Sequence, residues 1–250
     1  MTPALRTDGL GKRWGAFEAN SDISLSIPQG ARHALIGPNG AGKSTFIHLL
    51  TGYLRPSAGK VYLDGECITA LPQHQRVRRG MARTFQVNQL FPDFTVLESV
   101  LMAIFERKGL GTLWRRTVAS MAAEIDEAQA LLQSLRLQRE ADTRTCELPY
   151  GKQRLVEIAL ALAARPKLLL LDEPAAGIPT SESGELFEVI ASLPRAVTIL
   201  FIEHDMDLVF RFAEQITVLV GGRLLTQGTP DEIAADPRVK EVYLGEAEHG

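Results

Sequence analysis

The stretch from Gly37 to Thr45 reads Gly-Pro-Asn-Gly-Ala-Gly-Lys-Ser-Thr and fits the phosphate-loop pattern G-x-x-x-x-G-K-[ST] at every fixed position. An apolar strand at 34–36 leads into it, and a helical pattern with apolar residues at 46, 47, 49 and 50 follows. Because the motif needs a strand before it and a helix after it, this context separates it from an ordinary glycine-rich turn. The chain is therefore predicted to bind a nucleotide.

The residue types of this loop suit phosphate. Gly37, Gly40 and Gly42 let the backbone turn sharply and bring successive N–H groups close to an anion. Lys43 supplies a positive charge for the β- and γ-phosphates, and Ser44 supplies a hydroxyl for Mg²⁺. The other loop residues expected to contact ATP are Pro38, Asn39, Ala41 and Thr45. Kinases, GTPases, helicases and transport motors share this loop, so it does not name a reaction.

Composition narrows the class of protein. The chain has 250 residues and is 45% hydrophobic, which is ample for a buried core. Its formal net charge of -3 gives no broad attraction to nucleic acid. Cys67 and Cys146 are far apart, so neither a disulfide framework nor a zinc site is indicated. Without a signal-peptide pattern or a membrane-spanning stretch, we expect a cytoplasmic protein that reaches a membrane only through a partner.

The remaining patterns predict an α/β fold. Residues 4–27 indicate strand, loop and strand, with Trp14 in the loop, and Asp64-Gly65 is a hairpin signal between 61–63 and 66–68. Residues 87–164 are mostly helical, and strands then alternate with helices again. The basic segment 76–80 is expected to form a solvated surface.

These patterns predict a phosphate-loop NTPase core with a mostly parallel sheet, N-terminal antiparallel β elements and an inserted helical subdomain. We assign 1–86 and 165–250 to the nucleotide-binding core and 87–164 to the helical subdomain, within a single domain of 1–250.

A second chemical motif follows the apolar strand 168–171, where Asp172 and Glu173 stand side by side. Open parallel sheets place their active sites at such strand ends. Asp172 can hold Mg²⁺ through water, and Glu173 can polarise the water that attacks the γ-phosphate. Together with the phosphate loop, this pair favours hydrolysis of ATP over two surface acids at a strand end.

The segment Leu148-Pro149-Tyr150-Gly151-Lys152-Gln153, at a helix start shortly before the acidic strand, resembles the signature sequence of ABC-type ATPases. The resemblance covers nearly the whole chain, and the motifs come in the family's order. It implies that Trp14 stacks on adenine, that Gln86 senses Mg²⁺ and a transmembrane partner, and that His204 hydrogen-bonds the γ-phosphate. It also implies that residues 149–153 contact the ATP held by another subunit.

Finer likeness points to one branch. The stretches 150–154, 172–177, 202–206 and 236–239 are similar to those of ATP-binding subunits of branched-chain amino acid importers. The resemblance implies an ATP-hydrolysing motor on the inner face of the cell membrane. Its implied partners are a second ABC ATPase subunit, identical or paralogous, two transmembrane permeases and, indirectly, a solute-binding protein, with no nucleic acid.

Two residues depart from the family pattern. Pro149 replaces the usual signature serine, and Pro179 stands where the family has Asp or Asn. Proline suits a first helical position, so we expect hydrolysis to survive. Two other functions stay open at this point: a regulatory ABC subunit that hydrolyses poorly, and a soluble ABC ATPase acting on DNA or ribosomes.

Overall fold

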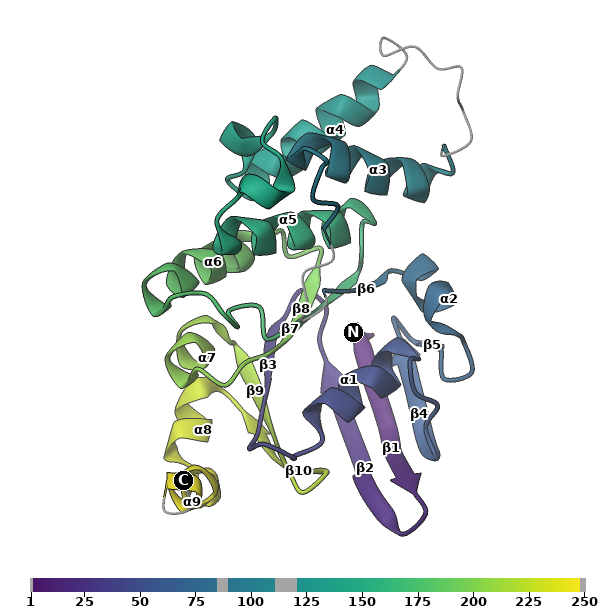
Figure 1. Cartoon of the computed structure of the whole chain (residues 1–250). Coiled ribbons are helices and arrows are strands. Elements are labelled where there is room, and N and C mark those ends of the chain that lie inside the picture. Colours follow the sequence, from purple (N-terminus) through teal and green to yellow (C-terminus); the bar gives the residue numbers. More distant parts are fainter. Residues whose placement is uncertain (1, 85–89, 111–120, 248–250) are drawn as a thin grey trace. The chain divides into compact units, whose positions relative to one another are not determined.

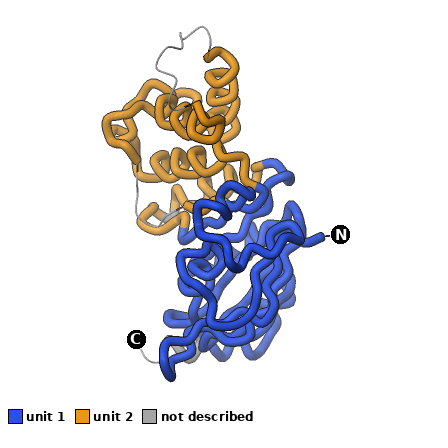
Figure 2. The backbone as a smooth tube through the Cα atoms, turned by 90° about the vertical axis from the view of Figure 1, so that its right-hand side faces the viewer, with its two compact units in different colours: residues 1–81, 167–173, 194–250 blue, residues 82–166, 174–193 orange. Residues whose placement is uncertain are grey.

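The structure is a computed structural model that describes residues 2–84, 90–110 and 121–247. The chain divides into two compact units (Figure 2): unit 1 comprises 1–81, 167–173 and 194–250, and unit 2 comprises 82–166 and 174–193. The described part of the predicted helical segment 87–164 lies in unit 2, which also contains 174–193. Gln86 lies outside the described residues.

Unit 1 contains a mostly parallel sheet with the strand order β10-β9-β3-β8-β7-β6 (Figure 1). Its strands are β3 (Arg32–Ile36), β7 (Leu168–Asp172), β8 (Thr198–Ile202), β9 (Gln215–Val220), β10 (Arg223–Gly228) and β6 (Met81–Arg83), of which only Met81 belongs to unit 1. Every residue of β3, β7 and β8 is buried, as expected of parallel strands covered on both faces. The predicted fold class is confirmed.

The second sheet of unit 1 is antiparallel, with the order β2-β1-β4-β5. It consists of β1 (Leu5–Trp14), β2 (Phe17–Ile27), β4 (Ala58–Leu63) and β5 (Glu66–Cys67). The hairpin at Asp64 and Gly65 is confirmed, with φ values of 52° and 83°. The placement of Trp14 in a loop is wrong: it ends β1, because only Gly15 and Ala16 separate the paired Trp14 and Phe17.

Helix α1 (Lys43–Thr51) begins at the phosphate loop and lies against the antiparallel sheet (Figure 1). Its buried apolar side chains belong to one cluster with residues of β1, β2, β3, β7 and β8. The helix ends at Gly52, whose φ of 78° matches the predicted left-handed position. The helix that follows the phosphate loop is thus fixed by the core of unit 1.

The expectation of a solvated surface at 76–80 is wrong for Arg76, which lies on α2 (Gln73–Arg78) and is 1% exposed. Its guanidinium donates to the carbonyls of Leu49 (2.8 Å), Leu50 (2.6 Å), Thr69 (2.8 Å) and Leu71 (3.0 Å). Two of these carbonyls belong to the last turn of α1, whose terminal carbonyls lack helical donors. Burial lowers the pKa of Arg76 to about 10. Arg76 therefore joins α2 to the end of the phosphate-loop helix.

Unit 1 ends in short helices: α7 (Met206–Phe212), α8 (Pro230–Ala235) and α9 (Pro237–Ala247). Unit 2 contains α3 (Val96–Lys108), α4 (Ala122–Ser134), α5 (Tyr150–Ala163) and α6 (Thr180–Ser192), with 3₁₀ turns at Gln138–Glu140 and Thr145–Glu147. Helix α3 contacts α4 and α5, and α5 contacts α6. Within the described ranges, no helix has the length and apolar character needed to cross a membrane.

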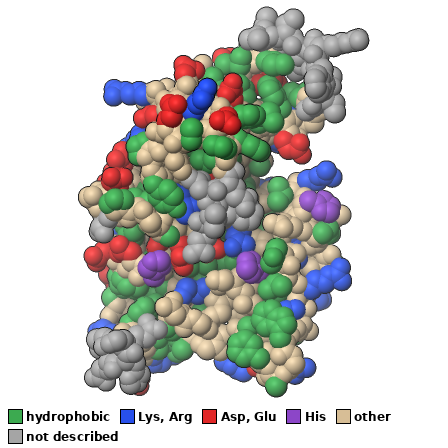
Figure 3. All heavy atoms as spheres, viewed as in Figure 1, with side chains coloured by type: hydrophobic (Ala, Val, Ile, Leu, Met, Phe, Trp, Pro, Cys, Tyr) green, Lys and Arg blue, Asp and Glu red, His purple; other side chains and the backbone are tan. Residues whose placement is uncertain are grey.

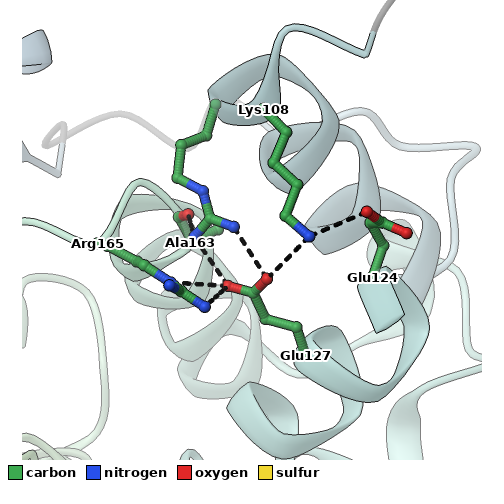
Figure 4. A network of polar contacts seen from close by, with 6 residues as sticks. Lys108, Glu124, Glu127, Ala163 and Arg165 are labelled. Atoms are coloured by element: carbon green, nitrogen blue, oxygen red, sulfur yellow. Dashed lines mark hydrogen bonds and ion pairs between the residues drawn. The ribbon is translucent and has the colours of Figure 1, made fainter. Parts of the chain in front are cut away.

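An ionic network joins the helices of unit 2 (Figure 4). Glu127 on α4 accepts hydrogen bonds from Arg107 of α3 (2.8 and 2.9 Å) and from Arg165 (2.9 Å), which follows α5. The Arg107 hydrogen bond is the main reason that the pKa of Glu127 falls to about 2. Arg107 also donates to the carbonyl of Ala163 at 2.9 Å, and Lys108 pairs with Glu124 at 2.9 Å. The network therefore ties the ends of α3 and α5 to α4.

The acid stability of unit 1 is expected to depend on His33, a fully buried residue of β3 whose Nε2 lies 2.8 Å from Thr217 Oγ1. Burial lowers its pKa from 6.5 to about 4, so folding favours the neutral ring. This contribution is present above pH 6.5 and is lost as the pH falls from 6.5 towards 4. Between pH 7 and pH 5, His33 should remove about 2 kcal/mol from the free energy of unfolding.

Urea unfolding of the parent and of His33→Gln at a series of pH values tests this expectation. The substituted amide keeps a polar group near Thr217 but does not titrate, so the variant should lose less stability on acidification than the parent. Parallel pH profiles for the two proteins would contradict it.

Candidate nucleotide-binding site

The phosphate loop is packed too closely for side chains at two of its glycines. A Cβ on Gly37, whose φ is 152°, would lie 2.2 Å from the carbonyl oxygen of Leu219. A Cβ on Gly42, whose φ is 90°, would lie 2.5 Å from both the Ala19 carbonyl oxygen and Asn20 Nδ2. These glycines are therefore required by positive φ as well as by contact with neighbouring backbone.

Two segments distant in sequence hold this loop in place. The N–H of Gly222, in the β9–β10 turn, donates to the carbonyl of Ala41 at 3.1 Å, and the Gly222 carbonyl accepts from Ser21 at 2.8 Å. Asn20 on β2 is 2% exposed, and its Nδ2 donates to the carbonyl of Gly42 at 3.2 Å. Sequence reasoning missed Asn20 because a single polar residue in a strand carries no signal of a partner 22 residues away.

The loop presents donors where an anion would bind. Helix α1 starts after Gly42 without a side-chain cap, so its first N–H groups are not satisfied by a capping residue. The ammonium of Lys43 donates to the carbonyls of Gly37 and Pro38, and therefore lies over the loop. Ser44 is exposed beside it. Helix N-termini of this kind bind phosphate through N–H groups and the positive end of the helix.

A cavity of about 420 Å³ lies beside the loop. It is lined by Trp14, Phe17, Glu18, Ala19, Gly40, Gly42, Ser44, Thr45 and Gly221. The structure thus brings the predicted base-stacking residue Trp14 to the same cavity as the phosphate loop. Phe17 was not predicted as a site residue. Its pairing with Trp14 across a two-residue turn is the signal that could have identified it.

The two acidic residues and the predicted switch histidine lie at the carboxyl ends of adjacent parallel strands. Asp172 ends β7 and is 8% exposed, while Glu173 follows with its side chain 25% exposed. His204 follows β8, and its Nδ1 lies 3.8 Å from Glu173 Oε1. Strand β8 pairs with both β7 and β3, and β3 leads into the phosphate loop. The phosphate loop and these three side chains therefore lie at the carboxyl ends of neighbouring parallel strands.

The backbone around Glu173 and His204 is held in place. Glu173 has a φ of 49°, an uncommon value for a residue with a side chain, and its N–H donates to the Ile202 carbonyl at 3.0 Å. The buried Glu203 accepts from the N–H of His204 at 3.3 Å. Asp205 caps α7 by accepting from the N–H groups of Asp207 and Leu208. These contacts set the direction in which the Glu173 and His204 side chains leave the backbone.

The residues predicted to hold Mg²⁺ are Ser44, Asp172 and Gln86, the last outside the described residues. Within the described ranges, no group of three or more His, Cys, Asp or Glu side chains could hold a metal ion by itself. Mg²⁺ at nucleotide sites uses one or two protein oxygens together with phosphates and water. The hydroxyl and the carboxylate of unit 1 are donors of this kind, so the residues present fit a nucleotide-bound ion.

The predicted signature residues lie in unit 2. Pro149 is the N-cap of α5, with a φ of -56° and a ψ of 150°, so its predicted position inside the first turn is wrong. Its carbonyl accepts the N–H of Gln153 at 3.0 Å, which is a helical hydrogen bond. Tyr150 is 38% exposed, and Lys152 pairs with Glu140 at 3.3 Å. A Cβ on Gly151 would have a normal contact of 3.5 Å with Glu182 Oε2.

The N-cap position explains why a proline is acceptable at 149, because an N-cap residue donates no helical hydrogen bond. Pro179 likewise precedes α6 as its N-cap.

Pro149→Ser should add a hydroxyl cap worth about 1 kcal/mol and change ATP turnover by less than about fivefold. Steady-state phosphate release from the parent and the variant tests this. An increase from undetectable to normal turnover would show instead that Pro149 disables hydrolysis.

Comparisons with known proteins identify close similarities. The ABC transporter family profile matches residues 20–176, and a profile described as branched-chain amino acid ATP-binding cassette transporter matches 223–249. The chain is 39% identical to the high-affinity branched-chain amino acid transport ATP-binding protein of Pseudomonas aeruginosa, over 98% of this chain and 99% of that protein. Its counterpart in Salmonella typhimurium is 40% identical, with the same coverage.

A solved structure is similar in fold. The ADP conformation of an ATP-binding cassette of an ABC transporter matches with a TM-score of 0.85 and 32% identity, covering 98% of this chain and 100% of that chain. The similarity therefore extends over both compact units and includes a protein that was solved with a nucleotide.

Proposed function

Because the chain belongs to the ABC transporter family of ATP-binding proteins, in the branched-chain amino acid branch, we propose that it is the ATP-hydrolysing motor subunit of an importer for branched-chain or related amino acids. The observation that carries the hydrolytic role is the position of Glu173 and His204 on adjacent strand ends beside the strand of the phosphate loop. The role in amino acid import is inferred from the names of the relatives.

In this proposal, the base of ATP stacks on Trp14, and its phosphates lie in the loop 37–45 under Lys43 and the N-terminus of α1. Ser44, Asp172 and Gln86 hold Mg²⁺. When bound, the ion would offset negative charge on the phosphates. The hydrogen bonds from Asn20 to the Gly42 carbonyl and from Gly222 to the Ala41 carbonyl hold the loop in its binding conformation.

Glu173 is the general base of the proposed reaction. Its carboxylate accepts a proton from the water whose oxygen attacks the γ-phosphorus, and the bond from that phosphorus to the bridging oxygen of ADP breaks. His204 donates a hydrogen bond to the γ-phosphate, which keeps the phosphate close to Glu173. The products are ADP and inorganic phosphate.

The proposed assembly completes each site from two subunits. Pro149, Tyr150, Gly151, Lys152 and Gln153 contact the ATP held by a second ABC ATPase subunit, which is another copy or a paralogue. Two permeases hold the pair at the inner face of the membrane, and a solute-binding protein delivers the amino acid to them. Opening and closing of the ATPase pair then moves the solute.

Affinity purification from gently solubilised membranes of the native host tests this function. A tagged chain should recover two multi-spanning permeases, and an untagged strain provides the control. The complex, placed in lipid vesicles with its solute-binding protein, should then take up leucine only when ATP is supplied. Repeated recovery of soluble proteins or nucleic acid in place of permeases would overturn the importer function. ATP binding without turnover in the intact complex would indicate a regulatory subunit.

A further inference from the structure

The turn between β1 and β2 carries two large exposed aromatic side chains. Trp14 is 46% exposed and Phe17 is 67% exposed. Figure 3 shows hydrophobic side chains on the surface over β1 and β2. A single exposed aromatic residue is common on protein surfaces. Two of them that line the same cavity as a phosphate loop need a separate explanation.

Strand pairing sets the relation between the two rings. Trp14 and Phe17 are direct partners across the β1–β2 pair. Side chains of directly opposite residues leave the same face of an antiparallel pair, with Cβ atoms about 4.5 to 5.5 Å apart. Both side chains line the cavity that Ser44 and Thr45 also reach. The register therefore places the Phe17 side chain on the same face of the strand pair as Trp14, at the cavity beside the phosphate loop.

Lys12 supports the Trp14 ring. Its Nζ lies 5.2 Å from the centre of the indole and donates to the Arg55 carbonyl at 2.9 Å. The hydrogen bond fixes the ammonium, and the cation–π contact in turn restrains the indole. A restrained indole loses less conformational freedom when a base stacks on it. Ordering of the Trp14 side chain therefore costs less binding free energy.

We propose that Phe17 is a specificity-determining residue that lies against the base stacked on Trp14 and selects purine over pyrimidine nucleotides. The inference rests on the proposed function, since it assumes that the cavity binds ATP. A bicyclic purine extends far enough to contact both neighbouring rings, whereas a pyrimidine on Trp14 offers less surface to Phe17. Removal of the Phe17 ring should therefore weaken purine binding more than pyrimidine binding.

Tryptophan fluorescence gives a direct measurement. The chain has two tryptophans, and Trp114 lies outside the described residues, so Trp114→Phe leaves Trp14 as the single emitter next to the cavity. Titration of this background protein with ATP, CTP and inorganic tripolyphosphate gives a Kd for each, with competition against ATP used for tripolyphosphate. If ATP does not change the Trp14 emission, and the protein retains no labelled ATP in a filter-binding assay, both the proposed function and this inference are overturned.

With ATP binding established, Phe17→Ala should raise the Kd for ATP about 5- to 20-fold, raise the Kd for CTP less than about threefold and leave the Kd for tripolyphosphate unchanged. Phe17→Tyr should restore the ATP value. Tyr53→Ala is the matched control, because Tyr53 is also 67% exposed in unit 1 but does not line the cavity. An ATP Kd within twofold of the background, or equal weakening of all three ligands, would overturn the role of Phe17 and leave the proposed function intact.

Discussion

Glu173→Gln is expected to lower ATP turnover by at least about 100-fold while the protein still binds ATP. The amide keeps the shape of the side chain and its position near His204 but cannot accept a proton from water. Hydrolysis should therefore stop before the bond to the γ-phosphate breaks, and the ATP-bound subunit pair should accumulate. Phosphate release and size-exclusion chromatography with ATP measure the two effects.

Glu185→Gln is the control for this experiment, since it makes the same chemical change at an exposed position of α6. Its turnover should equal that of the parent. Phosphate release by both variants is measured in the proposed complex with the permeases, and formation of the ATP-bound pair is measured by size-exclusion chromatography of the isolated subunit. Normal hydrolysis by Glu173→Gln would reject Glu173 as the general base, even if the importer function holds.

Arg76→Met is expected to destabilise the protein by about 3 to 5 kcal/mol. Methionine fills a similar volume but donates no hydrogen bond, so the carbonyls of Leu49, Leu50, Thr69 and Leu71 lose the bonds that Arg76 gives them. The Leu49 carbonyl keeps the N–H of Gly52. Two of these carbonyls end the helix that starts at the phosphate loop. Urea unfolding monitored by circular dichroism measures the change.

Arg78→Met provides the matched control, because Arg78 is an exposed residue of the same short helix. It should change the free energy of unfolding by less than about 0.5 kcal/mol. Arg76→Lys should fall between the two, since an ammonium has three donors but not the planar fork of arginine. Equal stability of Arg76→Met and the parent would show that these hydrogen bonds do not contribute to folding.

The parts of the fold that were predicted correctly have local signals. The phosphate loop, the Asp64-Gly65 hairpin and the buried strands each depend on a few adjacent residues with distinct conformational preferences. Trp14 belongs to β1 and not to a loop, because Gly15 and Ala16 alone separate the paired residues Trp14 and Phe17. The acidic pair and His204 come together because parallel strands end at one edge, which a sequence pattern can also indicate.

Other features depend on contacts between distant residues and had no local signal. Arg76 stands in a basic segment, and only its contacts with the end of α1 distinguish it from its exposed neighbours. Asn20 reaches the phosphate loop from strand β2, before the loop in sequence, and Gly222 reaches it from the β9–β10 turn, after the loop. Such hydrogen bonds are fixed by tertiary packing, which composition and periodicity do not specify.

The left-handed backbone of Glu173 has an evolutionary consequence. A φ of 49° favours glycine or asparagine, so a glutamate is kept at this position at the expense of folding stability. On the proposed role of Glu173 as general base, selection for hydrolysis would retain the carboxylate. If a descendant of this chain lost its catalytic duty, drift towards glycine or asparagine at this position would stabilise it. A relative with either residue here is therefore a candidate for a lineage that has given up turnover.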